Sequence, residues 1–341
     1  MGNKTKRMKE AAYYISNPDG TVVCVLCPHR CKIDEAKCGR CRSRMNRGGH
    51  LYSLAYARIC AMHADPMEKK PLFHFLPGAT CFSIASAGCN LSCLNCQNWS
   101  VSQVSPMEIP SQTLLPEDCV RLAKKYGCRA VAYTYTEPLT YLEYVRDCAS
   151  ACQEAGLKNV LVTAGYVNEA PLRDLLPFID AVNIDLKSFS DEVYRKVSRV
   201  RLQPILDTLL AMRDAGVWIE ITHLLIPTVN DNEQDFRAMC CWLVTNGFAD
   251  SPLHISRFFP RYRLQQLEPT PLETLLVAKQ IAEEEGLRFV YIGNTSLPDV
   301  GNTYCPRCGK RLVRREGYCV SQAGFVGVCP FCGTSIPGWW T

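Results

Sequence analysis

The chain has 341 residues, 47% of them hydrophobic and 21% charged, which excludes a disordered protein and predicts one large domain or about two average ones. No run approaches the roughly 18 consecutive apolar residues of a membrane-spanning helix, and the basic start MGNKTKRMKE has no apolar signal segment, so we expect a cytoplasmic protein without a membrane partner. The 38 basic residues exceed the 33 acidic ones by 5, a surplus too modest to indicate a nucleic-acid partner.

Cysteine is the distinctive residue of this composition. A cytosolic chain is kept reduced, so its 21 thiols indicate metal sites or catalytic groups and not a disulfide framework. Thirteen of them gather in three groups, at 24–41, 89–96 and 305–332. The other eight are expected to be small buried hydrophobes, namely Cys60, Cys81, Cys119, Cys128, Cys148, Cys152, Cys240 and Cys241.

The first group is CVLCPHRCKIDEAKCGRC (24–41). Thiolates this close together predict a metal site, and both zinc and an auxiliary iron–sulfur cluster remain open. The basic residues nearby would offset thiolate charge, form a solvated face or bind a polyanion. They are Arg30, Lys32, Lys37, Arg40, Arg42, Arg44 and Arg47.

A segment rich in polar residues, DPMEKKPLFH (65–74), follows. Its side chains suit either a substrate or the packing of the domain that comes next.

Short apolar runs then alternate with helical stretches such as 116–127 and 139–156. Strands that are nearly all apolar suit a parallel sheet buried on both faces, and six or seven such units favour a closed barrel or a partial (βα)6 barrel over an open sheet. The expected strands are 82–87, 130–135, 159–164, 181–186, 217–226, 253–258 and 289–293.

The second cysteine group directly follows the first of these strands. Cys89, Cys93 and Cys96 have the spacing C-x3-C-x2-C on a loop at the carboxyl end of the strand, where such folds carry their chemistry. Closed zinc sites need four ligands, whereas three thiolates suit an iron–sulfur cluster with one iron left open. A zinc site completed by a distant His or Cys is the alternative.

The third group consists of two C-x2-C pairs, CPRCG (305–309) and CPFCG (329–333). Four thiolates with this spacing predict a structural zinc site in a small zinc-ribbon-like lobe, with a rubredoxin-like iron as the alternative. Its ligands would be Cys305, Cys308, Cys329 and Cys332, leaving Cys319 spare. The expected domains are therefore a cysteine-rich segment (1–64), a barrel (65–300) and a terminal lobe (301–341).

Several sequence words, in order, resemble the radical S-adenosylmethionine (radical SAM) proteins of the AmmeMemoRadiSam system, relatives of the pyruvate formate-lyase activating enzymes. The resemblance covers nearly the whole chain. The words are DPMEKKPLFHFLPG (65–78), GCNLSCLNCQNWSVSQ (88–103), AYTYTEP (132–138), NIDLKSF (183–189), LLIPTVND (224–231), LHISRFFPRY (253–262) and VYIGN (290–294).

This resemblance implies a 4Fe–4S cluster held by Cys89, Cys93 and Cys96, whose open iron binds S-adenosylmethionine (SAM). One electron would cleave SAM to a 5′-deoxyadenosyl radical, which abstracts hydrogen from a protein or small molecule that the sequence does not identify. The electron implies a flavodoxin- or ferredoxin-like donor. The resemblance also gives the first group four ligands, Cys24, Cys27, Cys31 and Cys41, with Cys38 as an extra.

Other family positions are expected to bind the cofactors. Thr136 and Glu137 follow the second strand and would meet the SAM amino group, although Glu137 could instead stabilise a helix start. Thr163 and Gly165 match the first and last residues of a Thr-Asn-Gly word of the activating enzymes, and Ala164 stands where that word has asparagine.

Asp185 and Lys187 match an Asp-x-Lys word near the SAM carboxylate and a monovalent cation, with a structural salt bridge as the alternative. Arg257, which can offer a carboxylate two hydrogen bonds, and Asn294 complete the candidates. Asn95 stands where the superfamily often has an aromatic residue against adenine, a role that Trp99 could assume.

Three functions follow as hypotheses. The first is an AmmeMemoRadiSam-type radical SAM enzyme, and the second is an activase that installs a glycyl radical on a partner protein. The third is a zinc-rich module that binds protein or nucleic acid without catalysis.

Overall fold

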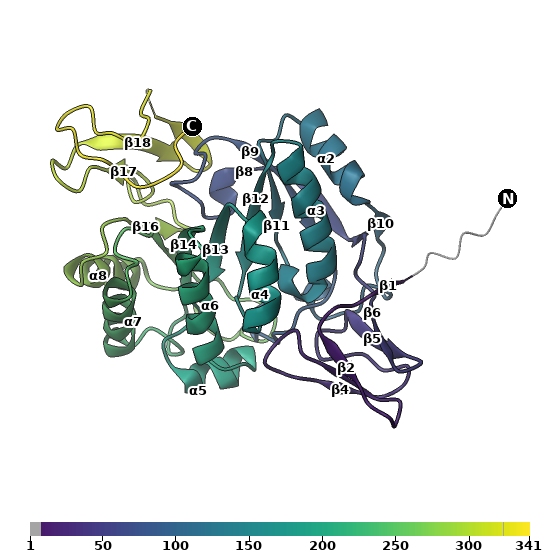
Figure 1. Ribbon diagram of the computed structural model, residues 1–341. Helices are drawn as coiled ribbons and strands as arrows, with labels where there is room; N and C mark the ends of the chain where they lie inside the picture. Colours follow the sequence, from purple (N-terminus) through teal and green to yellow (C-terminus); the bar gives the residue numbers. More distant parts are fainter. Residues whose placement is uncertain (1–7, 323) are drawn as a thin grey trace.

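The computed structural model describes residues 8–322 and 324–341. Its centre is a curved sheet of eight strands, seven parallel and one antiparallel at the edge (Figure 1). The strands in spatial order are β16 (Val290–Gly293), β15 (Leu253–Arg257), β14 (Trp218–Leu225), β13 (Ala181–Asp185), β12 (Lys158–Thr163), β11 (Ala130–Tyr133), β9 (Thr80–Ala85) and β8 (Ala61–Pro66).

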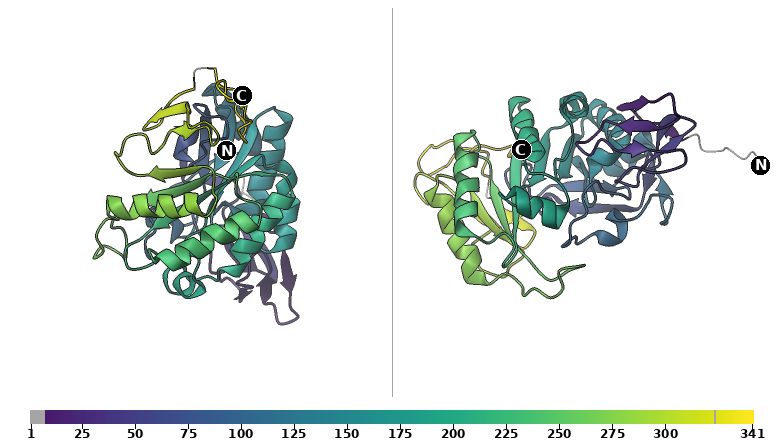
Figure 2. Two further views of the ribbon diagram at one scale, coloured as in Figure 1. Left: turned by 90° about the vertical axis from the view of Figure 1, so that its left-hand side faces the viewer. Right: turned by 90° about the horizontal axis from the view of Figure 1, so that it is seen from below.

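Helices cover the outer face of this sheet, one layer deep (Figures 1 and 2). Six βα crossovers connect the seven parallel strands, and β16 and β8 remain separate edges, so the barrel is partial, as the sequence predicted. The crossover helices are α2 (Pro116–Lys125), α3 (Leu142–Glu154), α4 (Glu169–Leu175), α6 (Gln203–Asp214), α7 (Glu233–Thr245) and α8 (Leu272–Glu284), with shorter turns α1 (Trp99–Ser102) and α5 (Asp191–Val193).

Buried cysteines fill gaps beneath these helices, with two exceptions to the prediction, of which the first is Cys60, a residue that is only partly buried just before β8. Cys119, Cys148 and Cys152 are fully buried between α2, α3 and the sheet, as expected of small hydrophobes. Cys241 is exposed, because its neighbour Cys240 occupies the buried side of α7. The prediction that Cys241 is buried was therefore wrong.

The segment between β8 and β9 packs against the inner face of the sheet. Leu72 and Phe75 form an apolar cluster with Ala132 and Val160. The buried carboxylate of Glu220 on β14 accepts hydrogen bonds from the backbone N–H groups of residues 73 and 74, at 2.8 and 2.7 Å. The 65–74 segment thus has a packing role, one of the two alternatives that its sequence left open.

The N-terminal residues form small antiparallel sheets beside the carboxyl ends of the parallel strands. One sheet has the strand order β1 (Lys9–Glu10), β6 (His50–Ser53) and β5 (Arg44–Arg47). Another has the order β2 (Tyr14–Ser16), β3 (Val22–Cys24) and β4 (Lys32–Ile33). The short strand β7 (Arg58–Ile59) pairs with β10 (Gln112–Thr113).

The C-terminal lobe, built on β17 (Thr303–Tyr304), β18 (Arg311–Glu316) and β19 (Cys319–Ser321), lies at the opposite end of the molecule (Figures 1 and 2). Hydrogen bonds attach the lobe to the segment between β8 and β9. The backbone N–H of Trp339 donates to the His74 carbonyl at 2.7 Å, and the Arg315 side chain donates to the Phe73 carbonyl at 2.6 Å. Within the described residues, no helix is long and apolar enough to cross a membrane.

Candidate functional site

The loop that carries Cys89, Cys93 and Cys96 begins just after β9, at the carboxyl edge of the sheet. Neighbouring loops hold its backbone in place. The N–H groups of Ser92 and Leu94 donate to the carbonyls of Ser198 and Val197, at 3.1 and 3.0 Å. The three-thiol loop is therefore seated on the segment that follows β13.

Side chains near this loop contact the thiols themselves. The Cys93 thiol donates to the Ser198 hydroxyl at 3.4 Å, and the Cys96 sulfur lies 3.2 Å from the Ser102 hydroxyl. Burial raises the pKa of Cys89 and of Cys93, so both are neutral thiols near pH 7 until a metal displaces their protons.

Glu137 lies at the start of a single turn, Pro138–Tyr141, next to the loop. Its buried carboxylate accepts from the Thr163 hydroxyl at 2.6 Å and from the backbone N–H of Ala164 at 2.8 Å. It also accepts from the Leu139 N–H at 3.1 Å, as a helix-capping residue does. Burial raises the pKa of Glu137, while these hydrogen bonds lower it. Glu137 therefore joins the ends of β11 and β12 beside Cys89.

The two residues flanking Ala164 are also held tightly. The Gly165 N–H donates to the Thr163 hydroxyl at 3.0 Å, and a β-carbon on Gly165 would lie 2.7 Å from Ile184. Because Gly165 also has a positive φ of 69°, glycine is favoured there. Thr136 is half-buried and donates to the Ser86 carbonyl at 2.6 Å, just before the thiol loop.

Asp185 and Lys187 form an ion pair at the end of β13, with 2.8 Å between their Oδ2 and Nζ atoms. Burial alone would lower the pKa of Lys187, but the nearby Asp185 carboxylate and the Cys93 thiol, when ionised, raise it instead. Lys187 is therefore a firmly charged cation beside the thiol loop. Both residues line a small cavity that also contains Asn95 of the loop.

Arg257 and Asn294 are the two candidates that lie apart from this group. The Arg257 Nε donates to the Thr270 carbonyl at 2.8 Å, and the Asn294 side chain donates to the Arg257 carbonyl at 3.3 Å. Trp99, considered for adenine stacking, stacks on Tyr262, with 5.2 Å between ring centroids.

A larger cavity of about 650 Å³ opens between the two edges of the sheet and the C-terminal lobe. Asn294, His254 and Tyr291 line its sheet side, while Arg311 and Arg314 line its lobe side. Sequence reasoning missed this cavity, because its walls come from three distant parts of the chain.

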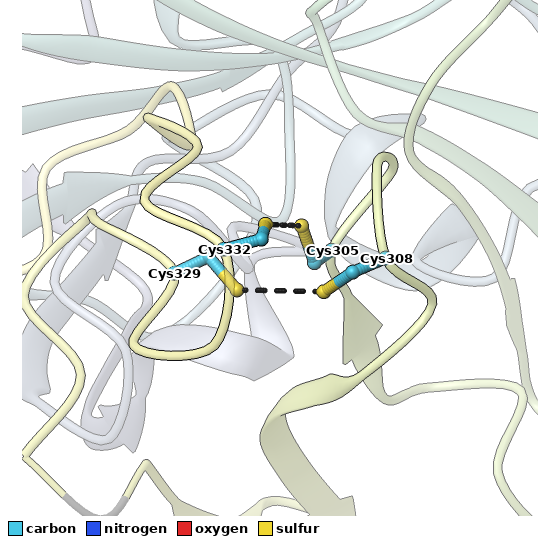
Figure 3. Close-up of side chains that lie close together, drawn as sticks. All are labelled: Cys305, Cys308, Cys329 and Cys332. Atoms are coloured by element: carbon cyan, nitrogen blue, oxygen red, sulfur yellow. Dashed lines mark hydrogen bonds between the residues drawn. The ribbon is translucent and has the colours of Figure 1, made fainter.

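The C-terminal cysteines converge as their spacing predicted. Figure 3 shows Cys305 facing Cys332 and Cys308 facing Cys329, with sulfur–sulfur distances of 3.5 and 3.7 Å. Zinc–sulfur bonds of about 2.3 Å in a tetrahedron place neighbouring sulfurs about 3.8 Å apart, so this group matches a single tetrahedral ion. Across residues 8–322 and 324–341, it is the only group of three or more such side chains whose ligand atoms all lie within 4.8 Å of one another.

Three thiols on the loop after the first parallel strand of a curved α/β sheet are the arrangement expected of proteins that bind an iron–sulfur cluster with one open iron. Residues 83–240 match the family model of the radical SAM superfamily. The chain is 44% identical over 335 residues to the uncharacterized protein MJ0808 of Methanocaldococcus jannaschii, a match that covers 96% of this chain and 99% of the relative.

It is also 24% identical over 222 residues to the pyruvate formate-lyase 1-activating enzyme of Escherichia coli (strain K12), covering 60% of this chain and 89% of that enzyme. Among solved structures, SuiB of Streptococcus suis bound to the precursor peptide SuiA has the same fold, with a TM-score of 0.50, 15% identity, and coverage of 67% of this chain and 52% of SuiB. Residues 83–240 therefore form a radical SAM domain, and the chain has homology to the pyruvate formate-lyase activating enzymes.

The thiol loop fits the cluster that this superfamily implies. Its three thiols share one loop, and the pKa of Cys89 is raised by burial first, then by the Glu137 carboxylate and by the thiols of Cys93 and Cys96 when these are ionised. Soft thiolates are the ligands that iron–sulfur clusters take, and three of them leave one iron free. Cys89, Cys93 and Cys96 would hold this cluster.

Proposed function

We propose that the chain is a radical SAM enzyme of the AmmeMemoRadiSam type, with its cluster on Cys89, Cys93 and Cys96. The observation that carries the proposal is the three-thiol loop beside Glu137 and Lys187, within the region that matches the superfamily. When bound, the cluster and SAM supply a 5′-deoxyadenosyl radical that removes hydrogen from a substrate.

The residues around the loop would orient SAM. Lys187 offers a cation to the SAM carboxylate, and Asp185 offers its carboxylate to a monovalent cation, 2.8 Å from Lys187. Glu137 and the Thr163–Gly165 strand end supply acceptors for the amino group. The 650 Å³ cavity at the sheet edge would admit the substrate, so Asn294 would act there and not on SAM.

The partner is a flavodoxin- or ferredoxin-like electron donor in the cytoplasm. Zinc is our assignment for Cys305, Cys308, Cys329 and Cys332, on the basis of their tetrahedral spacing. A single iron would fit the same sulfurs. The organisation that we propose is a cysteine-rich segment (1–64), a barrel (65–300) and a metal-binding lobe (301–341).

A second candidate is an activase that generates a glycyl radical on a partner protein. Its support is the match to the E. coli activating enzyme over 89% of that enzyme. This candidate predicts a large glycyl-radical enzyme encoded near the gene and a glycyl radical signal when the two proteins are mixed.

The decisive experiment is anaerobic reconstitution, with iron and zinc counted separately and 5′-deoxyadenosine measured after dithionite and SAM are added. The wild type should form 5′-deoxyadenosine and Cys93→Ala should not, while Cys60→Ser, outside the three cysteine groups, should resemble the wild type. A colourless protein that binds zinc alone and leaves SAM intact would contradict the proposal and favour a zinc-rich binding module.

A further inference from the structure

The N-terminal loop, residues 24–41, brings four of its five cysteines to one place. Cys24, Cys27, Cys31 and Cys41 line a single cavity, whereas Cys38 is exposed and lies outside it. Three of the four are buried, and Cys31 is partly exposed. Four thiols from one short segment thus face a common space, with an exposed cysteine of the same segment as a natural control.

The spacing of these thiols differs from that of the C-terminal group. The C-terminal sulfurs already have the separations of a single tetrahedral ion. In the part of the chain that the structure describes, no three of the N-terminal thiols lie within 4.8 Å of one another, and the same holds for Cys89, Cys93 and Cys96. An iron–sulfur cluster places its thiolates on different irons, farther apart than ligands of one ion, so the lack of such a close triplet among the described residues of either loop suits a cluster better than a single ion.

The N-terminal cavity is adjacent to the SAM-cluster loop. Asn90, which follows the first cluster ligand, lines the cavity, and its carbonyl oxygen lies 2.8 Å from the His29 ring. The Cys41 carbonyl oxygen is so close to Gly88 that a β-carbon there would approach it to 2.5 Å. The residues on either side of Cys89 therefore contact the N-terminal loop directly.

A buried cation completes the cavity wall. Arg44 is fully buried, lines the cavity and donates two hydrogen bonds to Glu143, at 2.7 and 2.6 Å. Its remaining N–H groups donate to the carbonyls of Thr140 and Ala12. A fixed guanidinium beside four thiolates would offset the negative charge of a bound cluster.

We propose that Cys24, Cys27, Cys31 and Cys41 bind a second iron–sulfur cluster, which passes electrons to the cluster on Cys89, Cys93 and Cys96. The inference rests on the proposed function and deepens it. In the transfer, an iron–sulfur or flavin protein is oxidised by one electron and the second cluster is reduced. The second cluster is then reoxidised as the cluster on Cys89, Cys93 and Cys96 gains the electron, and no bond or proton changes place.

The test uses the full chain, purified without oxygen. Wild type, Cys27→Ala, Cys93→Ala and the control Cys38→Ser are assayed for iron, acid-labile sulfide and zinc. Dithionite-reduced samples are then examined by low-temperature electron paramagnetic resonance with and without SAM. We expect the wild type to give two signals, of which only one shifts when SAM is added.

Cys93→Ala should keep iron, sulfide and the signal that ignores SAM, and Cys38→Ser should keep both signals. Cys27→Ala should lose only the signal that ignores SAM. If Cys93→Ala retains no iron–sulfur cluster, the inference is overturned, even where Cys27→Ala fails to fold. Loss of zinc with unchanged iron in Cys27→Ala also overturns it, whereas a wild type without a SAM-responsive signal contradicts the proposed function instead.

Electron delivery is tested in Cys27→Ala that retains the SAM-responsive signal. Its 5′-deoxyadenosine formation should fall at least about tenfold with a ferredoxin or flavodoxin donor and far less with reduced methyl viologen, a small reductant that reaches the remaining cluster directly. Equal losses with the protein donor and the small reductant would exclude the relay.

Discussion

The carbonyl oxygen of Cys41 lies 2.5 Å from the point where a β-carbon on Gly88 would stand. Gly88 also has a positive φ of 98° and immediately precedes Cys89. The N-terminal loop and the three-thiol loop therefore meet at their backbones. Glycine is required at this point because any other residue would push the two loops apart.

Replacing Gly88 by alanine should therefore harm both stability and cluster binding. The added methyl group strains the backbone and overlaps Cys41, so we expect a loss of about 2–4 kcal/mol in the free energy of unfolding and reduced iron content. The control is Gly127→Ala, which has a positive φ of 65° but open space around it. Urea unfolding and iron analysis compare the two, and equal effects would show that backbone strain alone matters.

A substitution in the Asp185–Lys187 pair can distinguish a role in cofactor binding from a purely structural role. Lys187→Met should weaken SAM binding at least about tenfold, because it removes a firmly charged partner for the SAM carboxylate, yet cost at most about 1 kcal/mol of stability. Lys196→Met, an exposed change in the next turn, serves as the control. Equilibrium dialysis with SAM gives the affinity. Unchanged affinity with a marked loss of stability would make the pair a purely structural salt bridge.

The buried Arg44–Glu143 pair joins the N-terminal segment to α3. Arg44→Met should destabilise the protein by about 3–5 kcal/mol, because it leaves the Glu143 carboxylate buried without its cation. The double variant Arg44→Met, Glu143→Leu should recover most of this loss. Urea unfolding of the single and double variants provides a thermodynamic cycle, and additive losses would contradict the expected coupling.

Much of the fold was predictable because its signals are local. Strands buried on both faces give continuous apolar runs, so the expected strand 159–164 matches β12 (Lys158–Thr163) to within one residue. The edge strand β8 was missed because its residues, AMHADP, lack that pattern. Glu220 was also missed as an anchor, because its partners at residues 73 and 74 are about 146 positions away and leave no local signal.

In the candidate site, too, the features that depend on neighbouring residues were predictable and those that depend on the folded sheet were not. The spacing of the cysteines predicted the thiol loop and the C-terminal group, because each such ligand pattern consists of residues close together in the sequence. The hydrogen bonds that join Glu137 to Thr163 and Ala164 depend on strand order, and only the folded sheet brings them together. Arg257 ends β15 and Asn294 follows β16, several strands away from β9 in the sheet, and their role in cofactor binding stays a prediction.

The C-terminal metal site should be independent of the proposed cluster site, because the C-terminal lobe lies at the opposite end of the molecule from the carboxyl edge of the sheet, where the three-thiol loop begins (Figure 1). Cys308→Ser should remove about one metal ion per chain and destabilise the lobe, while leaving the cluster iron on Cys89, Cys93 and Cys96 unchanged. Cys319→Ser, an exposed cysteine of the same lobe, should keep all its metal. Metal analysis of both variants is the measurement. A fall in cluster iron in Cys308→Ser would show that the sites are coupled.

The pH dependence of stability should reflect His74, a fully buried residue beneath the C-terminal lobe. Burial lowers the pKa of its ring from the usual 6.5 to about 4, and its two ring nitrogens lie 2.8 Å from the Pro337 carbonyl and 2.6 Å from the Tyr291 hydroxyl. The unfolded chain therefore binds a proton near pH 6.5 that the folded chain accepts only near pH 4. Stability should be fully present above pH 6.5 and decrease as the pH falls to about 4.

This shift corresponds to a loss on the order of 3 kcal/mol from His74 across that interval. His74→Gln should be less stable than the wild type at pH 7, since it loses buried contacts, but the difference should shrink as the pH falls. His223, whose pKa burial also lowers to about 4, titrates in both proteins and cancels in the comparison. Urea unfolding midpoints at pH 7, 5.5 and 4.5 give the measurement, and a difference that stays constant with pH would exclude His74 as the titrating group.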